Sequence, residues 1–119
     1  MVMSIRVVLI ALICALSAGG SFSHTKMTGS VPAEGATAKA GLAKIQLGFM
    51  QPVRLMMVKV MNTAHNKDVK AEFRPASTYK TMFHFKVAPL EAGFHQVSWT
   101  AIAKDGHVMK GSLSFNVAE

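Results

Sequence analysis

Apolar residues recur at every second position along much of this chain, and this spacing constrains the fold more than any other feature of the sequence. Successive side chains of a β-strand point to opposite faces. A two-residue period therefore predicts strands with one buried and one solvated face. The alternating apolar sets are Ile45, Leu47 and Phe49; Met56, Val58 and Val60; Phe83, Phe85 and Val87; Val97, Trp99 and Ala101; and Leu113, Phe115 and Val117.

Turn-forming residues separate these runs, and no segment beyond residue 23 shows the 3.6-residue period of an amphipathic helix. The turn signals lie at residues 32–35, 65–68, 89–93 and 104–106. About seven short strands with a lone tryptophan, Trp99, expected in the core predict an all-β chain. The expected architecture is an immunoglobulin-like β-sandwich of Greek-key type, in a single domain at 24–119.

Residues 1–23 have the three parts of a secretory signal peptide. Arg6 precedes an apolar run at 7–16, and small residues follow, with Ser21 and Ser23 at the −3 and −1 positions of a cut before His24. The apolar run is shorter than the roughly 20 residues that a spanning helix needs. Cleavage after Ser23 is the preferred interpretation. The alternatives are a cut after Ala18 or Gly20, or a lipoprotein cut before Cys14, where Ile13 occupies a position that favours a small residue.

Removal of 1–23 takes away Cys14, which is the chain's one cysteine. The exported part would then have no disulfide and no thiolate ligand, which excludes a blue-copper electron-transfer site. The formal charge of the whole chain is +7, and its lysines are scattered rather than clustered. We therefore expect a solvated basic surface and no nucleic-acid partner.

Asp105-Gly106-His107 lies between the last two alternating runs. Asp-Gly is a common two-residue hairpin signal, which would put His107 at the mouth of a hairpin. Such turns are abundant without any chemistry. However, a first-residue His24 would offer a metal its free α-amine and its imidazole. Together with Asp105 and His107 it would form a nitrogen and oxygen ligand set of the kind that suits Cu(II).

The chain resembles the CopC family of periplasmic copper-binding proteins. The segment SVPAEGA at 30–36 is similar to the SxPAxGA segment that follows the N-terminal histidine in that family. The stretch GFHQVSW at 93–99, followed by KDGH at 104–107, Gly111 and FNV at 115–117, resembles its Gly-Tyr/Phe-x-Val-x-Trp, Asp-x-His, Gly and Phe-x-Val ending. The resemblance implies an immunoglobulin-type sandwich and a role in copper tolerance or supply. It also implies an inner-membrane copper transporter as a partner.

Carried over residue by residue, the resemblance implies a Cu(II) site at His24, Asp105 and His107. Two positions depart from the family pattern: Gln51 replaces a carboxylate near the site, and Thr100 stands where an arginine often follows the tryptophan. Some members hold Cu(I) in a methionine-rich loop. Here Met61 with His65 is the best remnant of such a site, but packing is the expected role of Met61.

The remaining histidines are not expected to be ligands. His84 should face outward between two phenylalanines. His95 shares its parity with Val97 and Trp99, and we expect it at a sheet end near the copper.

The leading hypothesis is a periplasmic copper carrier or buffer that is not an enzyme, since no hydrolytic constellation is visible. One alternative is a copper oxygenase of the polysaccharide-cleaving kind, which would also begin with a chelating histidine. The other is a metal-free exported domain that binds protein partners.

Overall fold

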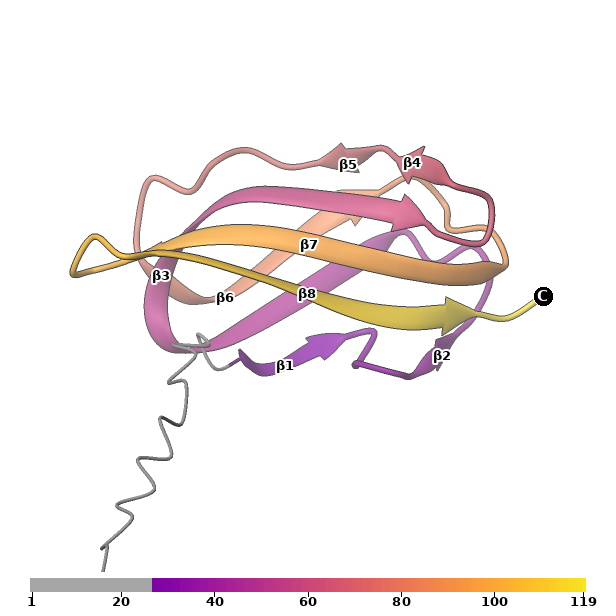
Figure 1. The fold of residues 1–119 in the computed structure, drawn as a ribbon, viewed down its shortest axis with the longest axis horizontal. Helices are drawn as coiled ribbons and strands as arrows, with labels where there is room; N and C mark the ends of the chain where they lie inside the picture. Colours follow the sequence, from indigo (N-terminus) through magenta and orange to yellow (C-terminus); the bar gives the residue numbers. More distant parts are fainter. Residues whose placement is uncertain (1–26) are drawn as a thin grey trace, which may run out of the picture.

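The structure is a computed structural model that describes residues 27–119, and this part of the chain is built from β-strands and loops (Figure 1). No helix in it is long and apolar enough to cross a membrane. The strands are β1 (Met27–Val31), β2 (Thr37–Ala38), β3 (Lys44–Asn62), β4 (Lys67–Val69), β5 (Ala71–Glu72), β6 (Lys80–Val87), β7 (Gly93–Ala103) and β8 (Val108–Val117). The predicted all-β sandwich is confirmed.

The longest strand, β3, belongs to both layers of the sandwich. Its first part pairs with β1 up to Phe49 and with β6 up to Gly48. Its second part pairs with β7 from Val53, where Lys80 of β6 also lies opposite, and with β4 near its end. The regular ladders are interrupted around Pro52, which has no N–H to donate. Figure 1 shows β3 bending there from one layer into the other. This bend brings β1, β6 and β7 together at one end of the molecule.

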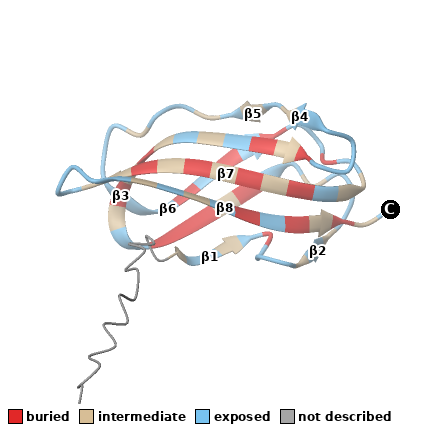
Figure 2. Cartoon of the chain, in the orientation of Figure 1, coloured by how far each residue is buried: buried red, intermediate tan, exposed pale blue. Residues whose placement is uncertain are grey.

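The core lies between the inward faces of the two layers, where buried residues, drawn in red, alternate with half-buried or exposed ones along β6, β7 and β8 (Figure 2). Trp99 is buried there, and its ring meets Phe49 edge-to-face with centroids 5.0 Å apart. Gly111 lies opposite Trp99 on β8, and a Cβ at this position would collide with the indole ring. The glycine after the Asp-x-His segment is thus required for the tryptophan to pack.

One of the five predicted alternating sets is interrupted at its first residue. Leu55 lies opposite Ala101 and Met57 lies opposite Thr100, so Met56 is an extra residue in a β-bulge of β3. A bulge shifts the alternation by one residue. Leu55 before the bulge and Val60 after it are therefore both buried, whereas Met56 is only half-buried. Sequence alternation alone did not identify Val53 and Leu55 as core residues.

Candidate metal centre

A tight turn joins β7 to β8 and carries the predicted Asp-x-His segment. The N–H of Ala103 donates to the carbonyl of His107 at 2.9 Å, and the N–H of Gly106 donates to the carbonyl of Ala103 at 2.9 Å. These bonds enclose Lys104, Asp105 and Gly106, so the loop has three residues rather than the predicted two. Gly106 occupies the positive-φ position (φ 88°) that commonly closes three-residue hairpin loops. His107 lies at the mouth of the hairpin, as predicted.

Asp105 and His107 are held against each other by two hydrogen bonds. The backbone N–H of His107 donates to Asp105 Oδ1 at 3.0 Å, and His107 Nδ1 lies 2.6 Å from Asp105 Oδ2. The backbone bond first, and the side-chain bond second, lower the pKa of the Asp105 carboxyl below its ordinary value. Both side chains are open to solvent, with exposed fractions of 61% and 81%. A ligand can therefore approach them freely.

This contact leaves one nitrogen of the His107 ring available for metal binding. A carboxylate only accepts hydrogen bonds, so Nδ1 carries the proton and Nε2 keeps its lone pair. Metal-binding histidines typically donate their second ring nitrogen to a carboxylate in this way. The pair thus presents Nε2 of His107 outward. Asp105 could add an oxygen if one of its two hydrogen bonds gave way.

Two candidate ligands are too few for a stable site. In residues 27–119, no group of three or more His, Cys, Asp or Glu side chains is placed to hold a metal ion. The third predicted ligand, His24, lies outside the described residues. A complete metal site at this turn needs further ligands, either from residues 1–26 or from another molecule.

The described chain begins at the end of the sandwich that carries the turn. Met27 lies opposite Phe49 on β3, and Val53, four residues further along β3, lies opposite Ala103 at the end of β7. Met27 and the turn therefore lie on either side of the same bend of β3. Three residues separate Met27 from a chain that starts at residue 24, and three residues can span at most about 10 Å. Gln51 is exposed at this bend.

The other histidines lie away from the turn. His84 is exposed on β6 opposite Gln46, as predicted. Met61 lies opposite Gln96, and His65 is exposed in the turn after β3, where its N–H donates to Asn62 Oδ1 at 3.3 Å. Met61 and His65 thus lie at the opposite end of the sandwich, which we call the far end.

His95 lies at a sheet end, as expected, but not at the end that carries Asp105 and His107. His95 is the third residue of β7 and lies at the far end, whereas the turn follows the last residue of that strand. At about 3.3 Å per residue the two positions are roughly 30 Å apart. His95 is 1% exposed, and its ring stacks on Phe115 with centroids 5.6 Å apart. It is a core residue.

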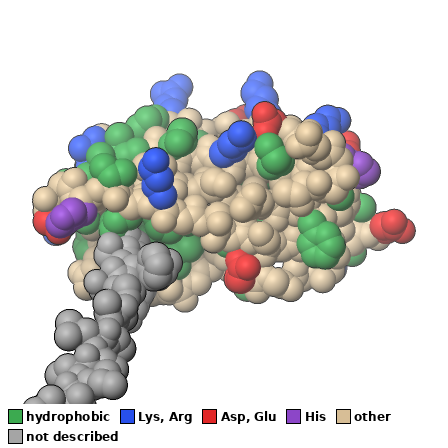
Figure 3. Space-filling view, in the orientation of Figure 1, with side chains coloured by type: hydrophobic (Ala, Val, Ile, Leu, Met, Phe, Trp, Pro, Cys, Tyr) green, Lys and Arg blue, Asp and Glu red, His purple; other side chains and the backbone are tan. Residues whose placement is uncertain are grey.

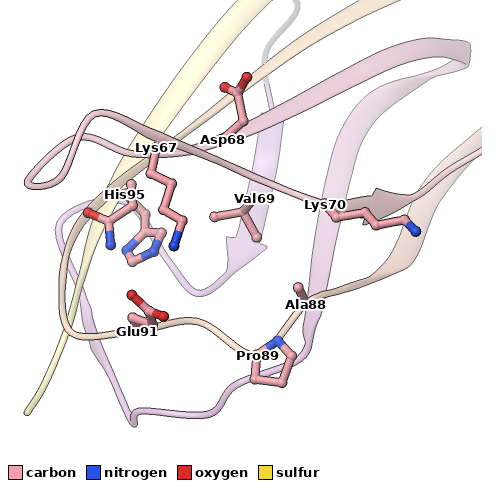
Figure 4. Close-up of a pocket in the computed structure, with 9 residues that line it drawn as sticks. Lys67, Asp68, Val69, Lys70, Ala88, Pro89, Glu91 and His95 are labelled. Carbon is pink, nitrogen blue, oxygen red and sulfur yellow. The ribbon is translucent and has the colours of Figure 1, made fainter.

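The surroundings of His95 form a small cavity that sequence reasoning missed (Figure 4). His95 Nδ1 lies 3.0 Å from the Gly93 carbonyl, so it donates there, and Nε2 makes no hydrogen bond to another described residue. Figure 4 shows the imidazole, the Lys67 ammonium and the Glu91 carboxylate directed into the same space. The cavity has a volume of about 240 Å³ and is lined by Asn62, Lys67, Asp68, Val69, Lys70, Ala88, Pro89, Glu91 and His95. Two segments that are distant in the sequence, 62–70 and 88–95, form it, which is why no local motif indicated it.

Comparison with known proteins identifies the relatives of this chain. Copper resistance protein C of Pseudomonas syringae pv. tomato is 34% identical over 103 residues, which cover 80% of this chain and 81% of that protein. Copper resistance protein C of Xanthomonas campestris pv. juglandis is 29% identical over 123 residues, covering 96% and 95% of the two chains.

Solved structures agree with these relatives. PcoC, a methionine-rich copper resistance protein from Escherichia coli, matches with a TM-score of 0.64 and 28% identity, covering 81% of this chain and all of that one. CopC from Methylosinus trichosporium OB3b shares the fold with a TM-score of 0.63 at 18% identity, covering 79% and 93%. The CopC domain model matches residues 27–118, so the chain belongs to the CopC family.

Proposed function

We propose that this protein is exported to the periplasm, loses residues 1–23, and binds one Cu(II) ion as a carrier or buffer in copper homeostasis. The observation that carries the proposal is the Asp105–His107 pair. It is exposed, its imidazole is oriented by a carboxylate, and it lies at the end where the described chain begins. The ligands would be the α-amine and imidazole of His24, Nε2 of His107, and Asp105.

The chemistry of this set favours Cu(II) over other ions. Amine and imidazole nitrogens with a carboxylate oxygen suit a tetragonal ion, whereas structural zinc sites are usually tetrahedral and Cu(I) prefers sulfur. The α-amine must lose its proton to bind, and its ordinary pKa is about 7.7–8.0. Copper affinity should therefore fall as the solution is acidified.

A carrier role without catalysis fits the surroundings of the pair better than an oxygenase does. Trp99 is buried in the core, and the strongly exposed Phe94 lies at the far end. Tyr79 is the exposed aromatic residue at the turn end, and its ring lies under the Lys104 ammonium. A polysaccharide-cleaving enzyme would need a broader aromatic face beside the copper.

The test uses the exported protein with its first residue identified by N-terminal sequencing. We expect it to begin at His24, to bind one Cu(II) with a tetragonal paramagnetic resonance spectrum showing nitrogen couplings, and to bind Cu(I) weakly. A matched variant with one glycine ahead of His24 should bind Cu(II) much more weakly, because its α-amine has become an amide. Metal-free thermal stability should be nearly equal in the two, since a terminus contributes little packing.

Three outcomes would count against this function. Equal Cu(II) affinity with and without the added glycine would show that the amine is not a ligand. Tight Cu(I) binding with no Cu(II) signal would point to methionine ligands. Peroxide-driven cleavage of a polysaccharide by the copper-loaded protein would favour the oxygenase.

A further inference from the structure

Exposed apolar side chains gather at the end of the sandwich that carries the 104–106 turn. Val108 is the second residue after the turn and is 61% exposed. Met57 lies opposite Thr100 of β7, two residues before the partner of Val108, and is 58% exposed. Met50 at the bend of β3 and Tyr79 beside β6 are exposed as well. These four side chains, with Lys80, Lys104 and Lys110, are called the turn-end surface below. Figure 3 shows hydrophobic and basic side chains gathered around the histidine at this end.

The charges of the turn-end surface are nearly all positive. Lys80 lies opposite Val53 at the bend, Lys104 is in the turn, and Lys110 lies opposite Thr100. All three are exposed. Asp105 is the acidic residue here, and both of its oxygens already accept hydrogen bonds from His107. The surface is therefore cationic and apolar at once.

Two other regions of residues 27–119 lack this combination. Further along the same outer face, β7 and β8 present small polar residues, including Ser98, Ser112 and Ser114. At the far end, the lysines are accompanied by acids. Lys59 lies 3.9 Å from Asp68, and Lys67 and Lys70 share a cavity with Asp68 and Glu91. The combination therefore distinguishes the turn-end surface from these two regions.

We propose that the turn-end surface docks on an anionic phospholipid membrane. Met, Val and Tyr side chains enter the interfacial layer, while lysines interact with the acidic headgroups. The apolar side chains come from separate segments near the 104–106 turn, and this turn projects from the end of the sandwich (Figure 1). A surface around a projecting turn suits a deformable lipid layer better than a rigid protein partner. Docking in this way would hold His107 against the membrane.

The test measures co-sedimentation of the metal-free exported protein with lipid vesicles, so that it does not depend on copper binding. We expect binding to phosphatidylglycerol–phosphatidylethanolamine vesicles that weakens with salt, and little binding to phosphatidylcholine vesicles. Replacing Lys80, Lys104 and Lys110 with glutamine should reduce vesicle affinity on the order of a hundredfold. The pair Val108→Ser and Met57→Ser should reduce it about tenfold.

Matched controls come from the other parts of the surface. Glutamine at Lys44, Lys70 and Lys86 removes the same charge, but away from the turn, and should weaken binding less than about threefold because salt screens distant charges. Phe94→Ser removes an apolar side chain that is 62% exposed at the far end and should change nothing. Circular dichroism verifies that every variant is folded.

The proposal is overturned if the protein does not bind anionic vesicles, or if the two triple-lysine variants lose affinity equally. It is also overturned if polyglutamate in solution binds as tightly as the vesicles and the Val108→Ser, Met57→Ser variant behaves like the parent. That result would indicate a purely electrostatic surface suited to an acidic protein.

Discussion

The two ends of β7 each carry a histidine, and the two residues are placed in opposite ways. His107, just past the C-terminal end of β7, is exposed and has Nδ1 held by a carboxylate, with Nε2 directed outward. His95, near the N-terminal end, is buried against Phe115 and has Nδ1 held by a backbone carbonyl. Both rings have a fixed tautomer. Solvent exposure and the neighbouring groups therefore distinguish a candidate ligand from a core residue, and the residue type alone does not.

The largest effect that this contrast predicts is on stability at the His95 end. His95→Ala should lower the free energy of unfolding by about 3 kcal/mol, because it leaves a cavity and removes the stack on Phe115. Urea denaturation measures the change, and His84→Ala on the solvated face of β6 is the control, with an expected change within about 0.5 kcal/mol. Cu(II) affinity should be unaltered in both variants. A His95→Ala protein that is as stable as the parent but binds copper poorly would contradict this prediction, because it would place His95 in the copper site and not in the core.

The next effect is on copper at the turn. His107→Ala should weaken Cu(II) binding at least tenfold, which corresponds to about 1.4 kcal/mol. Its free energy of unfolding should stay within about 0.5 kcal/mol of the parent, because the side chain is exposed. Competitive titration against a chelator measures the affinity. An unchanged affinity would show that the pair is only a turn motif.

Asp105→Asn tests whether Asp105 positions the His107 ring, because the substitution keeps the hydrogen bond that shapes the turn. The amide oxygen can still accept the His107 backbone N–H, but the amide nitrogen cannot accept the proton of Nδ1. Loss of such a carboxylate partner typically costs about tenfold in metal affinity. We expect a loss of that order with the metal-free fold retained by circular dichroism. Affinity equal to that of the parent would remove Asp105 from the site.

The smallest effect concerns the titration of Asp105 in the metal-free protein. Its pKa is lowered in the folded state, so the interaction stabilises the fold above the unfolded carboxyl pKa of about 3.9 and is lost as the pH falls through the lower folded value. Carbon-13 NMR of the carboxyl should show a midpoint below the ordinary range. In His107→Ala the midpoint should return only part of the way, since the backbone N–H remains. A complete return would mean that the side-chain contact dominates.

Much of the sandwich could be predicted because half-buried strands have an exact two-residue period. Phe83 with Phe85 and Leu113 with Phe115 are buried as expected. The prediction failed at Met56, because the segment LMMVKVM is apolar at nearly every position and fits either phase, so the bulge leaves no trace in the pattern.

Prediction of the site was similarly uneven. The Asp105–His107 pair could be identified because both residues belong to one turn, and a turn is a local motif. The placement of His95 relied on parity, which gives the face of a strand but not its end. Its cavity needed Lys67 and Glu91, whose proximity depends on the tertiary fold.

The sharing of β3 between both layers has a consequence for how the molecule opens. Because one continuous strand is hydrogen-bonded to β1 and β6 in one layer and to β7 in the other, neither layer can peel away without breaking ladders of that same strand. The backbone amides of β3 should therefore exchange with deuterium only when the whole domain unfolds, and together they should form the slowest-exchanging group. The exposed 104–106 loop, by contrast, can fluctuate without cost to that unit.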